Sequence, residues 1–148
     1  MNVVLHVVTQ GAVDKPLLLN EALPLEGRRG DLGGEVLAVV GVVAHEGGAV
    51  GQLGLDNVAA VQSRAESYVA ERGFATVIAR AVATIPQLID WAGHLVDEAG
   101  IMLALKGRFP HEELAGVPQG WSYTVDPLDV PGLEQRERHV VILKRRTE

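Results

Sequence analysis

The chain has 148 residues, a length that fits one domain around a single hydrophobic core. It contains no cysteine, so disulfides, thiolate nucleophiles and thiolate zinc sites are excluded, and the cytoplasm is the expected compartment. The 19 acidic and 13 basic residues give a formal net charge of −6, which argues against indiscriminate binding to nucleic acid, because phosphate neutralisation needs clustered Lys and Arg.

The N-terminal sequence carries neither a secretory signal nor a membrane span. Residues 1–8 lack a positively charged start and a small-residue cleavage site, so we expect no export. The longest apolar stretch, residues 36–44, is far shorter than the ~20 residues that a membrane span needs, and predicts a buried strand or helix at most. The five histidines are scattered without the spacing of a metal site, so we expect no metal.

Residues 1–51 differ in character from the rest of the chain. Ten of the seventeen glycines fall before residue 55, whereas all six aromatic residues fall after residue 67. Short Val and Leu runs between the glycines show no helical caps and no sustained helical period. We therefore treat residues 1–51 as an atypical segment and assign no regular element to it.

From residue 57 onward, strands and helices alternate. Apolar runs predict three strands, at residues 58–62, 74–79 and 101–105. A first helix is expected from Ala65 to Arg72, and a second from Pro86 to a stop at Gly100, with one apolar stripe of Leu88, Ala92, Leu95 and Val96. This alternation predicts an α/β fold with a mainly parallel sheet and helices on both faces.

The C-terminal part follows another pattern. Residues 121–125 alternate large and small polar side chains, and residues 139–144 form a β-branched run, with only a loop between them. Without a crossover helix, two such strands are most simply an antiparallel pair at the edge of the sheet.

Several residues that can carry chemistry follow the predicted strands. Ligands of open α/β sheets bind beyond the carboxyl ends of the strands. Glu66, Arg80 and Lys106 follow or end the predicted strands and therefore lie at such ends. On the residues alone, Glu66 is explained as an acid in a first helical turn, and Arg80 as the partner of a neighbouring acid. Lys106 fits an RNA contact and a solvated strand end equally well. Trp121 and Tyr123 are able to stack bases, although alternate strand aromatics are more often core.

The basic residues are concentrated in the same part of the chain. Ten of the thirteen lie from Arg64 onward. A local basic face for RNA is therefore possible despite the acidic total, and an ordinary solvated surface is the alternative.

Five segments together resemble one protein family. They are QLGLDNV at 52–58, QSRAE at 62–66, VIARAV at 77–82, ALKG at 104–107 and ERHVVIL at 137–143. In this order and spacing they resemble the glucose-inhibited division protein B family, the ribosomal RNA small subunit methyltransferases G. The resemblance implies a Rossmann-like methyltransferase sheet and formation of 7-methylguanosine in small-subunit (16S) ribosomal RNA from S-adenosylmethionine. We expect a cytoplasmic monomer with this RNA as its partner.

The resemblance also implies site residues. Ala65 and Glu66 correspond to the pair at the adenosine part of the cofactor, and Arg80 to an arginine of the same site. Lys106 corresponds to the lysine near the target guanosine or its phosphates. Two further residues, Arg136 and Arg138, are expected at the RNA backbone, where a contact positions the RNA without reading its sequence. No catalytic side chain is assigned.

The departures from the family pattern bear on activity. Ala75 replaces the usual acid of the F-D-x-V strand, and residues 1–51 lack the glycine-rich loop whose backbone amides approach the methionine half of the cofactor. We interpret residues 52–148 as the C-terminal part of a methyltransferase domain, and residues 1–51 as sequence read in another frame or behind a misplaced start. The missing loop predicts a poor or inactive catalyst.

Two other classes of function stay open at this point. One is a non-catalytic remnant that binds RNA or a partner without a cofactor. The other is a methyltransferase for a small molecule or a protein, which has the same fold but does not need the Lys106 and Arg138 matches.

Overall fold

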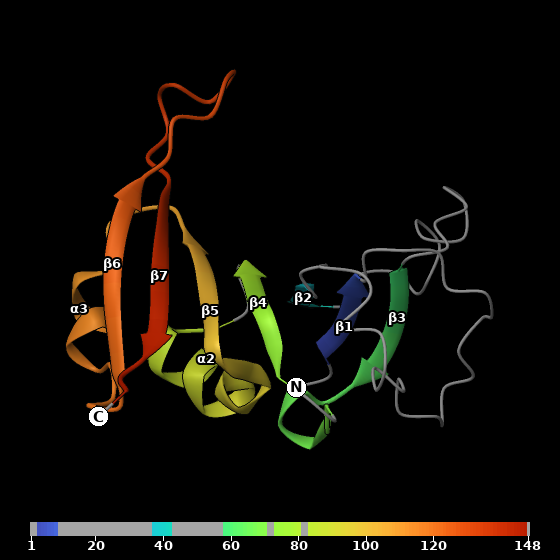
Figure 1. Ribbon diagram of the computed structural model, residues 1–148. Helices are drawn as coiled ribbons and strands as arrows, with labels where there is room; N and C mark the ends of the chain where they lie inside the picture. The colour runs from blue at the N-terminus through green and yellow to red at the C-terminus, as the bar shows by residue number, and fades with distance from the viewer. Residues whose placement is uncertain (1–2, 9–36, 43–57, 71–72, 81–82, 148) are drawn as a thin grey trace.

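The computed structural model describes residues 3–8, 37–42, 58–70, 73–80 and 83–147, which form one twisted sheet with short helices (Figure 1). The strands are β1 (Val3–Val8), β2 (Leu37–Val42), β3 (Val58–Ser63), β4 (Phe74–Arg80), β5 (Val96–Lys106), β6 (Trp121–Pro127) and β7 (His139–Arg145). The helices are α2 (Ile85–Ala92), α3 (His111–Ala115) and two single turns of 3-10 helix, η1 (Ala65–Ser67) and η2 (Gly93–Leu95).

The sheet has the order β3-β1-β2-β4-β5-β7-β6. Only the β2–β4 and β4–β5 pairings are parallel, and the other four are antiparallel. Following these pairings across the sheet, five strands run in one direction, and β1 and β7 run in the other. The α/β class is confirmed, but the mainly parallel sheet is corrected to a mixed one. The reason is that β1, from the segment without an assigned pattern, lies antiparallel between β3 and β2.

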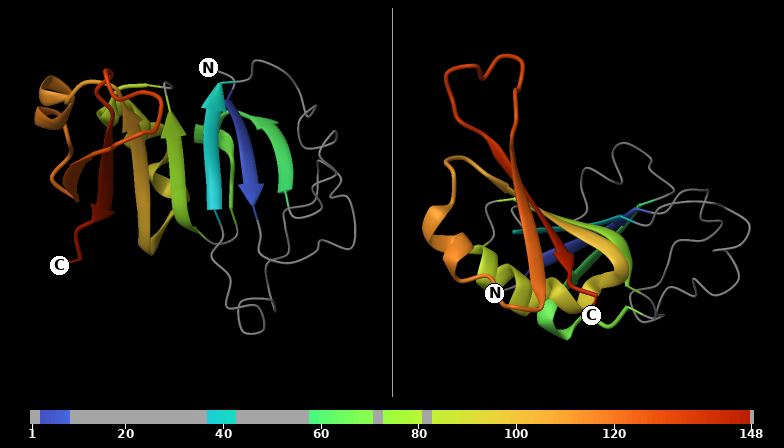
Figure 2. Two further views of the ribbon diagram at one scale, coloured as in Figure 1. Left: turned by 90° about the horizontal axis from the view of Figure 1, so that it is seen from above. Right: turned by 60° about the vertical axis from the view of Figure 1, so that its left-hand side comes forward.

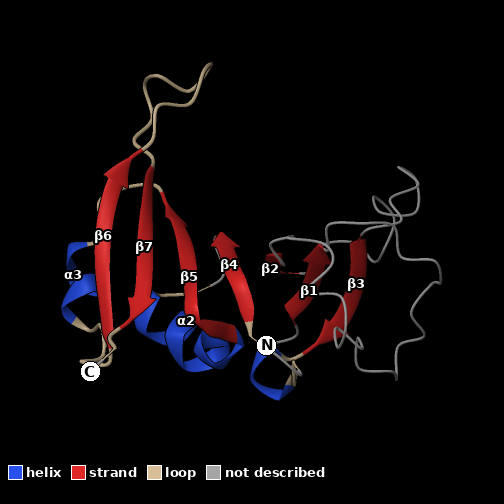
Figure 3. Ribbon diagram, in the orientation of Figure 1, coloured by secondary structure: helices blue, strands red, loops and turns tan. Residues whose placement is uncertain are grey.

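The strands expected from residue 57 onward are all present (Figure 3). β4 and β5 pair in parallel, with Val77 opposite Met102. β6 and β7 form the expected antiparallel pair at the sheet edge, with Tyr123 opposite Leu143. The apolar run at 36–44 contributes β2.

The helix expected over residues 65–72 is wrong. After the single turn η1, Tyr68 is already extended, with φ −76° and ψ 123°. The Tyr68 ring stacks on Phe74 at a centroid distance of 6.5 Å. This tertiary contact holds Tyr68 in an extended conformation, so the helical turn does not continue.

The second helix is shorter than expected, because it ends at Ala92 and β5 begins at Val96. Its four stripe residues are all buried, but Leu95 and Val96 reach the core from a 3-10 turn and a strand. Gly100 is not a helix stop. A Cβ at Gly100 would lie 2.7 Å from the carbonyl oxygen of Phe74, so the glycine permits close approach of β4 and β5.

The described helices all cover one face of the sheet (Figure 2). Alternate strand residues point into the core beneath them: Val77, Ala79, Met102, Ala104, Val141 and Leu143. On the other face, Ile78, Leu103 and Ile142 form a half-buried row. The expected helices on both faces are therefore not found among the described residues. Between β3 and β4, the described residues form only the single turn η1.

Candidate functional site at the carboxyl edge of the sheet

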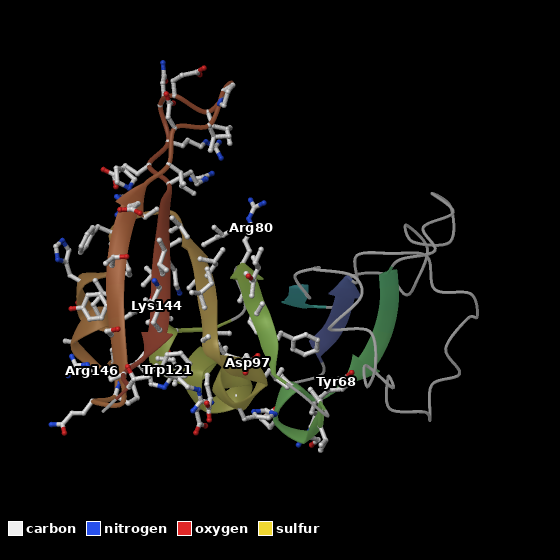
Figure 4. All side chains as sticks on the ribbon, viewed as in Figure 1. Tyr68, Arg80, Asp97, Trp121, Lys144 and Arg146 are labelled. Carbon is white, nitrogen blue, oxygen red and sulfur yellow. The ribbon has the colours of Figure 1, made fainter. Side chains whose placement is uncertain are left out.

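The ends of β4, β5 and β6 and the start of β7 meet along one edge, which we call the carboxyl edge. The register places Arg80 in one row with Leu105 and Val140, and Lys106 opposite His139. Arg80 is exposed at the end of β4 (Figure 4). Because it alternates with the buried Ala79, its side chain lies on the face of the sheet opposite the helices, whereas Lys106 faces α3.

Lys106 is held inside a small polar network. Its Nζ lies 2.7 Å from Glu113 Oε2 and donates a hydrogen bond of 2.8 Å to the carbonyl oxygen of Ala83. Glu113 Oε2 also accepts a hydrogen bond of 2.8 Å from the backbone amide of Ile85, at the start of α2. The two side chains are only 18% and 27% exposed. Lys106 therefore links the end of β5 to α3 and to the segment that follows β4.

Arg138 lies beside the backbone that follows β5. Its Nη1 donates a hydrogen bond of 2.8 Å to the carbonyl oxygen of Glu137, and a Cβ added at Gly107 would lie 3.8 Å from the same atom. His139 Nδ1 is 2.8 Å from the carbonyl oxygen of Gly107. Since a carbonyl only accepts, Nδ1 carries the proton in this contact. Arg138 is only partly buried and remains accessible at the carboxyl edge.

Arg136 lies on the loop between β6 and β7, residues 128–138, which extends away from the sheet (Figure 1). The backbone amide of Leu128 donates to the carbonyl oxygen of Arg138 and closes the base of this loop. The loop carries three acids beside its two arginines: Asp129, Glu134 and Glu137. Hydrogen bonds from the Gly132 amide and its own amide lower the pKa of Glu134. The expected basic rim is therefore neither contiguous nor purely basic.

Ala65 and Glu66 directly follow the end of β3. The register through β1 and β2 places Ser63 at the same edge of the sheet as Arg80. Tyr68, directly after η1, stacks on Phe74 at the first residue of β4, and its carbonyl oxygen is 3.0 Å from His94 Nε2. Arg80 is the last residue of β4, roughly 20 Å from Phe74 at ~3.3 Å per residue, and Figure 4 shows Tyr68 and Arg80 at opposite ends.

The expected single cleft for Ala65, Glu66 and Arg80 stays a prediction, because the chain starts from the edge that carries Arg80 and has reached the start of β4 by Tyr68. Only ten residues join Ser63 to Phe74, so the chain passes directly from the end of β3 to the start of β4. Ala65 is buried in the core with 3% of its surface exposed, and Glu66 is exposed.

An aromatic cluster at the carboxyl edge was missed by the sequence interpretation. The Phe109 ring lies 4.4 Å from the His111 ring and 5.6 Å from the His139 ring, between centroids, with the His139 ring edge-on. Phe109 is 40% exposed. The signal in the sequence was its position between a strand-end glycine and a short helix. No strand or helix periodicity directs a phenylalanine at that position into the core.

The two strand aromatics expected in the core behave differently. Trp121 is buried against Gly93, and the Arg145 guanidinium lies 5.3 Å from its ring centroid. Tyr123 is 44% exposed on β6, so the core interpretation holds for Trp121 and fails for Tyr123.

Among the described residues, no group of three or more His, Cys, Asp or Glu side chains is arranged to hold a metal ion. No helix in this part of the chain is both long and apolar enough to cross a membrane. The glycine-rich stretches at 27–34 and 46–51, where the sequence lacks the cofactor loop, lie outside the described residues.

Residues 48–141 match the family described as rRNA small subunit methyltransferase G. The match covers 94 of the 148 residues, from 48 to 141, and so more than half of the chain. The chain belongs to this family. The segments that carried the resemblance, from 52 to 143, lie almost wholly inside the matched region, so the recognition from sequence is confirmed.

Relatives of the same name align with the same part of the chain. The ribosomal RNA small subunit methyltransferase G of Photobacterium profundum is 46% identical over 95 residues, which are 64% of this chain and 46% of the relative. The proteins of that name from Salmonella arizonae and Salmonella newport are 44% and 45% identical over 94 residues, which are 63% of this chain and 45% of each relative. The chain thus spans less than half the length of these relatives.

Proposed function

We propose that the chain derives from an enzyme that transfers a methyl group from S-adenosylmethionine to N7 of a guanosine in 16S ribosomal RNA. Family membership supports this proposal, because the matched relatives bear the name of a methyltransferase of small-subunit ribosomal RNA. We further propose that it works in the cytoplasm as a monomer, and that residues 52–148 are the methyltransferase part.

Of the three residues that the family resemblance assigns to the cofactor, Ala65 is buried in the core, and only Glu66 and Arg80 present exposed polar side chains. The glycine-rich loop that would hold the methionine half is absent from the sequence of residues 1–51. In relatives with a complete site the cofactor supplies the methyl group; in this chain we derive no chemical step through it.

The missing loop favours a second function for the chain as it stands, namely RNA binding with little or no methyl transfer. The carboxyl edge offers exposed Arg80 and partly buried Arg138, and the loop between β6 and β7 adds exposed Arg136. Each arginine can bind a phosphate with two hydrogen bonds. Lys106 supports this edge from inside, since its ammonium is already paired with Glu113. Such contacts hold the RNA backbone without selecting a sequence.

One experiment tests both parts of the proposal. The full chain is incubated with labelled S-adenosylmethionine and small-subunit RNA from a strain that lacks the modification, beside the Photobacterium profundum relative. We expect RNA binding but at most a small fraction of the relative's methyl transfer. Equal turnover would overturn the proposed deficit in cofactor binding. Absence of any RNA binding would overturn the proposed RNA function.

A further inference from the structure

Phe109 is exposed where a buried aromatic ring would be the ordinary outcome. It lies in the connection between β5 and α3, and 40% of its surface is accessible. The other phenylalanine, Phe74, is 1% exposed in the core. Phe109 is therefore only partly covered by the protein, and part of its surface is accessible to a ligand.

The ring is fixed in place by its neighbours. His111 lies tilted beside it at 4.4 Å, and His139 meets it edge-on at 5.6 Å. The His139 ring is itself held by the contact of Nδ1 with the carbonyl oxygen of Gly107, at 2.8 Å. A ring held from two sides loses little conformational freedom when a flat ligand stacks on it.

The charges around the ring suit a nucleic acid strand. Arg108 precedes Phe109, and Arg138 lies beside Gly107, two residues before it. The acids in the same region are Glu112, Glu113 and Glu137; of these, Glu113 is paired with Lys106. Two accessible guanidinium groups next to an accessible aromatic ring provide a phosphate contact beside a stacking surface, the combination that binds single-stranded nucleic acids.

We propose that Phe109, held by His111 and His139, stacks against an unpaired base of the RNA while Arg108 and Arg138 contact the adjoining phosphates. This inference rests on the proposed RNA function and adds a binding position that the family match does not assign. Stacking tolerates any base, because every base has a π-face. The position therefore selects single-stranded over paired RNA.

The test measures binding of a fluorescently labelled single-stranded RNA of mixed sequence by anisotropy, with the full chain. Phe109→Ala should weaken binding on the order of tenfold, as expected for one lost base stack. Phe109→Trp should retain the affinity. Phe109→Leu keeps an apolar side chain but removes the π-face, so it should behave like Phe109→Ala. The matched control is Tyr123→Ala, which removes an exposed aromatic residue on β6 away from the carboxyl edge.

The outcomes distinguish this inference from the proposed RNA-binding function on which it rests. Wild-type affinity in both Phe109→Ala and Phe109→Leu would overturn the stacking role and leave RNA binding intact. Full affinity in Phe109→Leu alone would also overturn it, since an apolar contact would then suffice. Equal loss in Tyr123→Ala would mean that exposed aromatics bind RNA unspecifically. A wild-type chain that does not bind the RNA would overturn the proposed function together with this inference.

Discussion

The Lys106 ammonium and the backbone amide of Ile85 share one carboxylate oxygen, Glu113 Oε2, at 2.7 Å and 2.8 Å. The same ammonium reaches the carbonyl oxygen of Ala83. One carboxylate of α3 thus binds both the ammonium at the end of β5 and a backbone amide in the first turn of α2. A strand-end lysine that the sequence offered for RNA is instead part of the internal structure.

The first prediction concerns this shared oxygen. Glu113→Ala should lower the free energy of unfolding by about 1–3 kcal/mol, because it leaves a partly buried ammonium and an amide without their partner. Glu113→Gln should cost less, since the amide oxygen can still accept from Ile85. Urea denaturation measures both. Glu112→Ala, one residue away and exposed, is the control, and an equal loss there would contradict the role of Glu113.

The second prediction concerns the salt dependence of RNA binding. Arg138→Ala should reduce the slope of log affinity against log salt by about one unit, as for one lost phosphate contact. Arg136→Ala should do the same if the loop between β6 and β7 reaches the RNA. Lys106→Met should leave the slope nearly unchanged, because its charge is compensated by Glu113. A slope change for Lys106→Met as large as for Arg138→Ala would show that the ammonium reaches the RNA.

The third prediction concerns the cofactor. Titration calorimetry of the chain with S-adenosylmethionine should give an affinity on the order of a hundredfold or more below that of the Photobacterium profundum relative. Two lost charge-assisted hydrogen bonds, at about 1.5–3 kcal/mol each, are enough for this loss. Arg80→Ala should weaken the remaining affinity further, because Arg80 lies at the same edge of the sheet as the end of β3. Comparable affinities for the two proteins would contradict the proposed deficit in cofactor binding.

The fourth prediction concerns close contact between β4 and β5. Gly100→Ala should destabilise the protein by about 1–3 kcal/mol, because its Cβ would lie 2.7 Å from the Phe74 carbonyl oxygen and 3.0 Å from that of Ala75. Gly120→Ala is the matched control, since nothing lies within 4 Å of the added carbon. Thermal unfolding compares the two. Similar melting temperatures for both variants would mean that the strands can separate to admit a methyl group.

The fifth prediction concerns pH. Burial raises the pKa of Tyr68 above its ordinary value of 10.0, because it disfavours the phenolate. The folded state therefore holds this proton more tightly than the unfolded state, and the contribution is complete below pH 10 and is lost as the pH rises through the raised pKa. Tyr68→Phe should reduce the fall in stability above pH 10, measured by urea denaturation. Tyr123→Phe, at an exposed position, serves as control, and an identical effect there would contradict the assignment.

Sequence patterns predicted the strands better than the helices, for a physical reason. The runs at 74–79 and 101–105 are continuously apolar because each strand has neighbours on both sides and a helix layer on one face. The turn at Ala65 has helical propensity, but its continuation is decided by the stacking of Tyr68 on Phe74, which lies outside any local window. Gly100 resembles a helix stop in sequence, although its role depends on a neighbouring strand.

The candidate site shows the same limit. Spacing between Glu66 and Arg80 is preserved along the chain, yet their distance in space depends on how the connection from β3 reaches β4. Lys106 and Arg138 lie near each other because the antiparallel register of β5 and β7 pairs Lys106 with His139, and this pairing was not predictable from the chain order. The partner of Lys106 was not predictable, because Glu113 approaches from a helix seven residues later in the chain.

β1 and β2 lie between β3 and β4 and are the connection through which β3 belongs to the sheet. A shortened chain that began at residue 52 would keep the family-matching sequence but lose both strands. β3 would then have no neighbouring strand to pair with, and β4 would present unpaired amides and carbonyls where it now pairs with β2, at residues 76–79. Exposed strand edges of this kind recruit other chains and lead to aggregation. The segment that looks least like the family is therefore the part that covers the facing edges of β3 and β4.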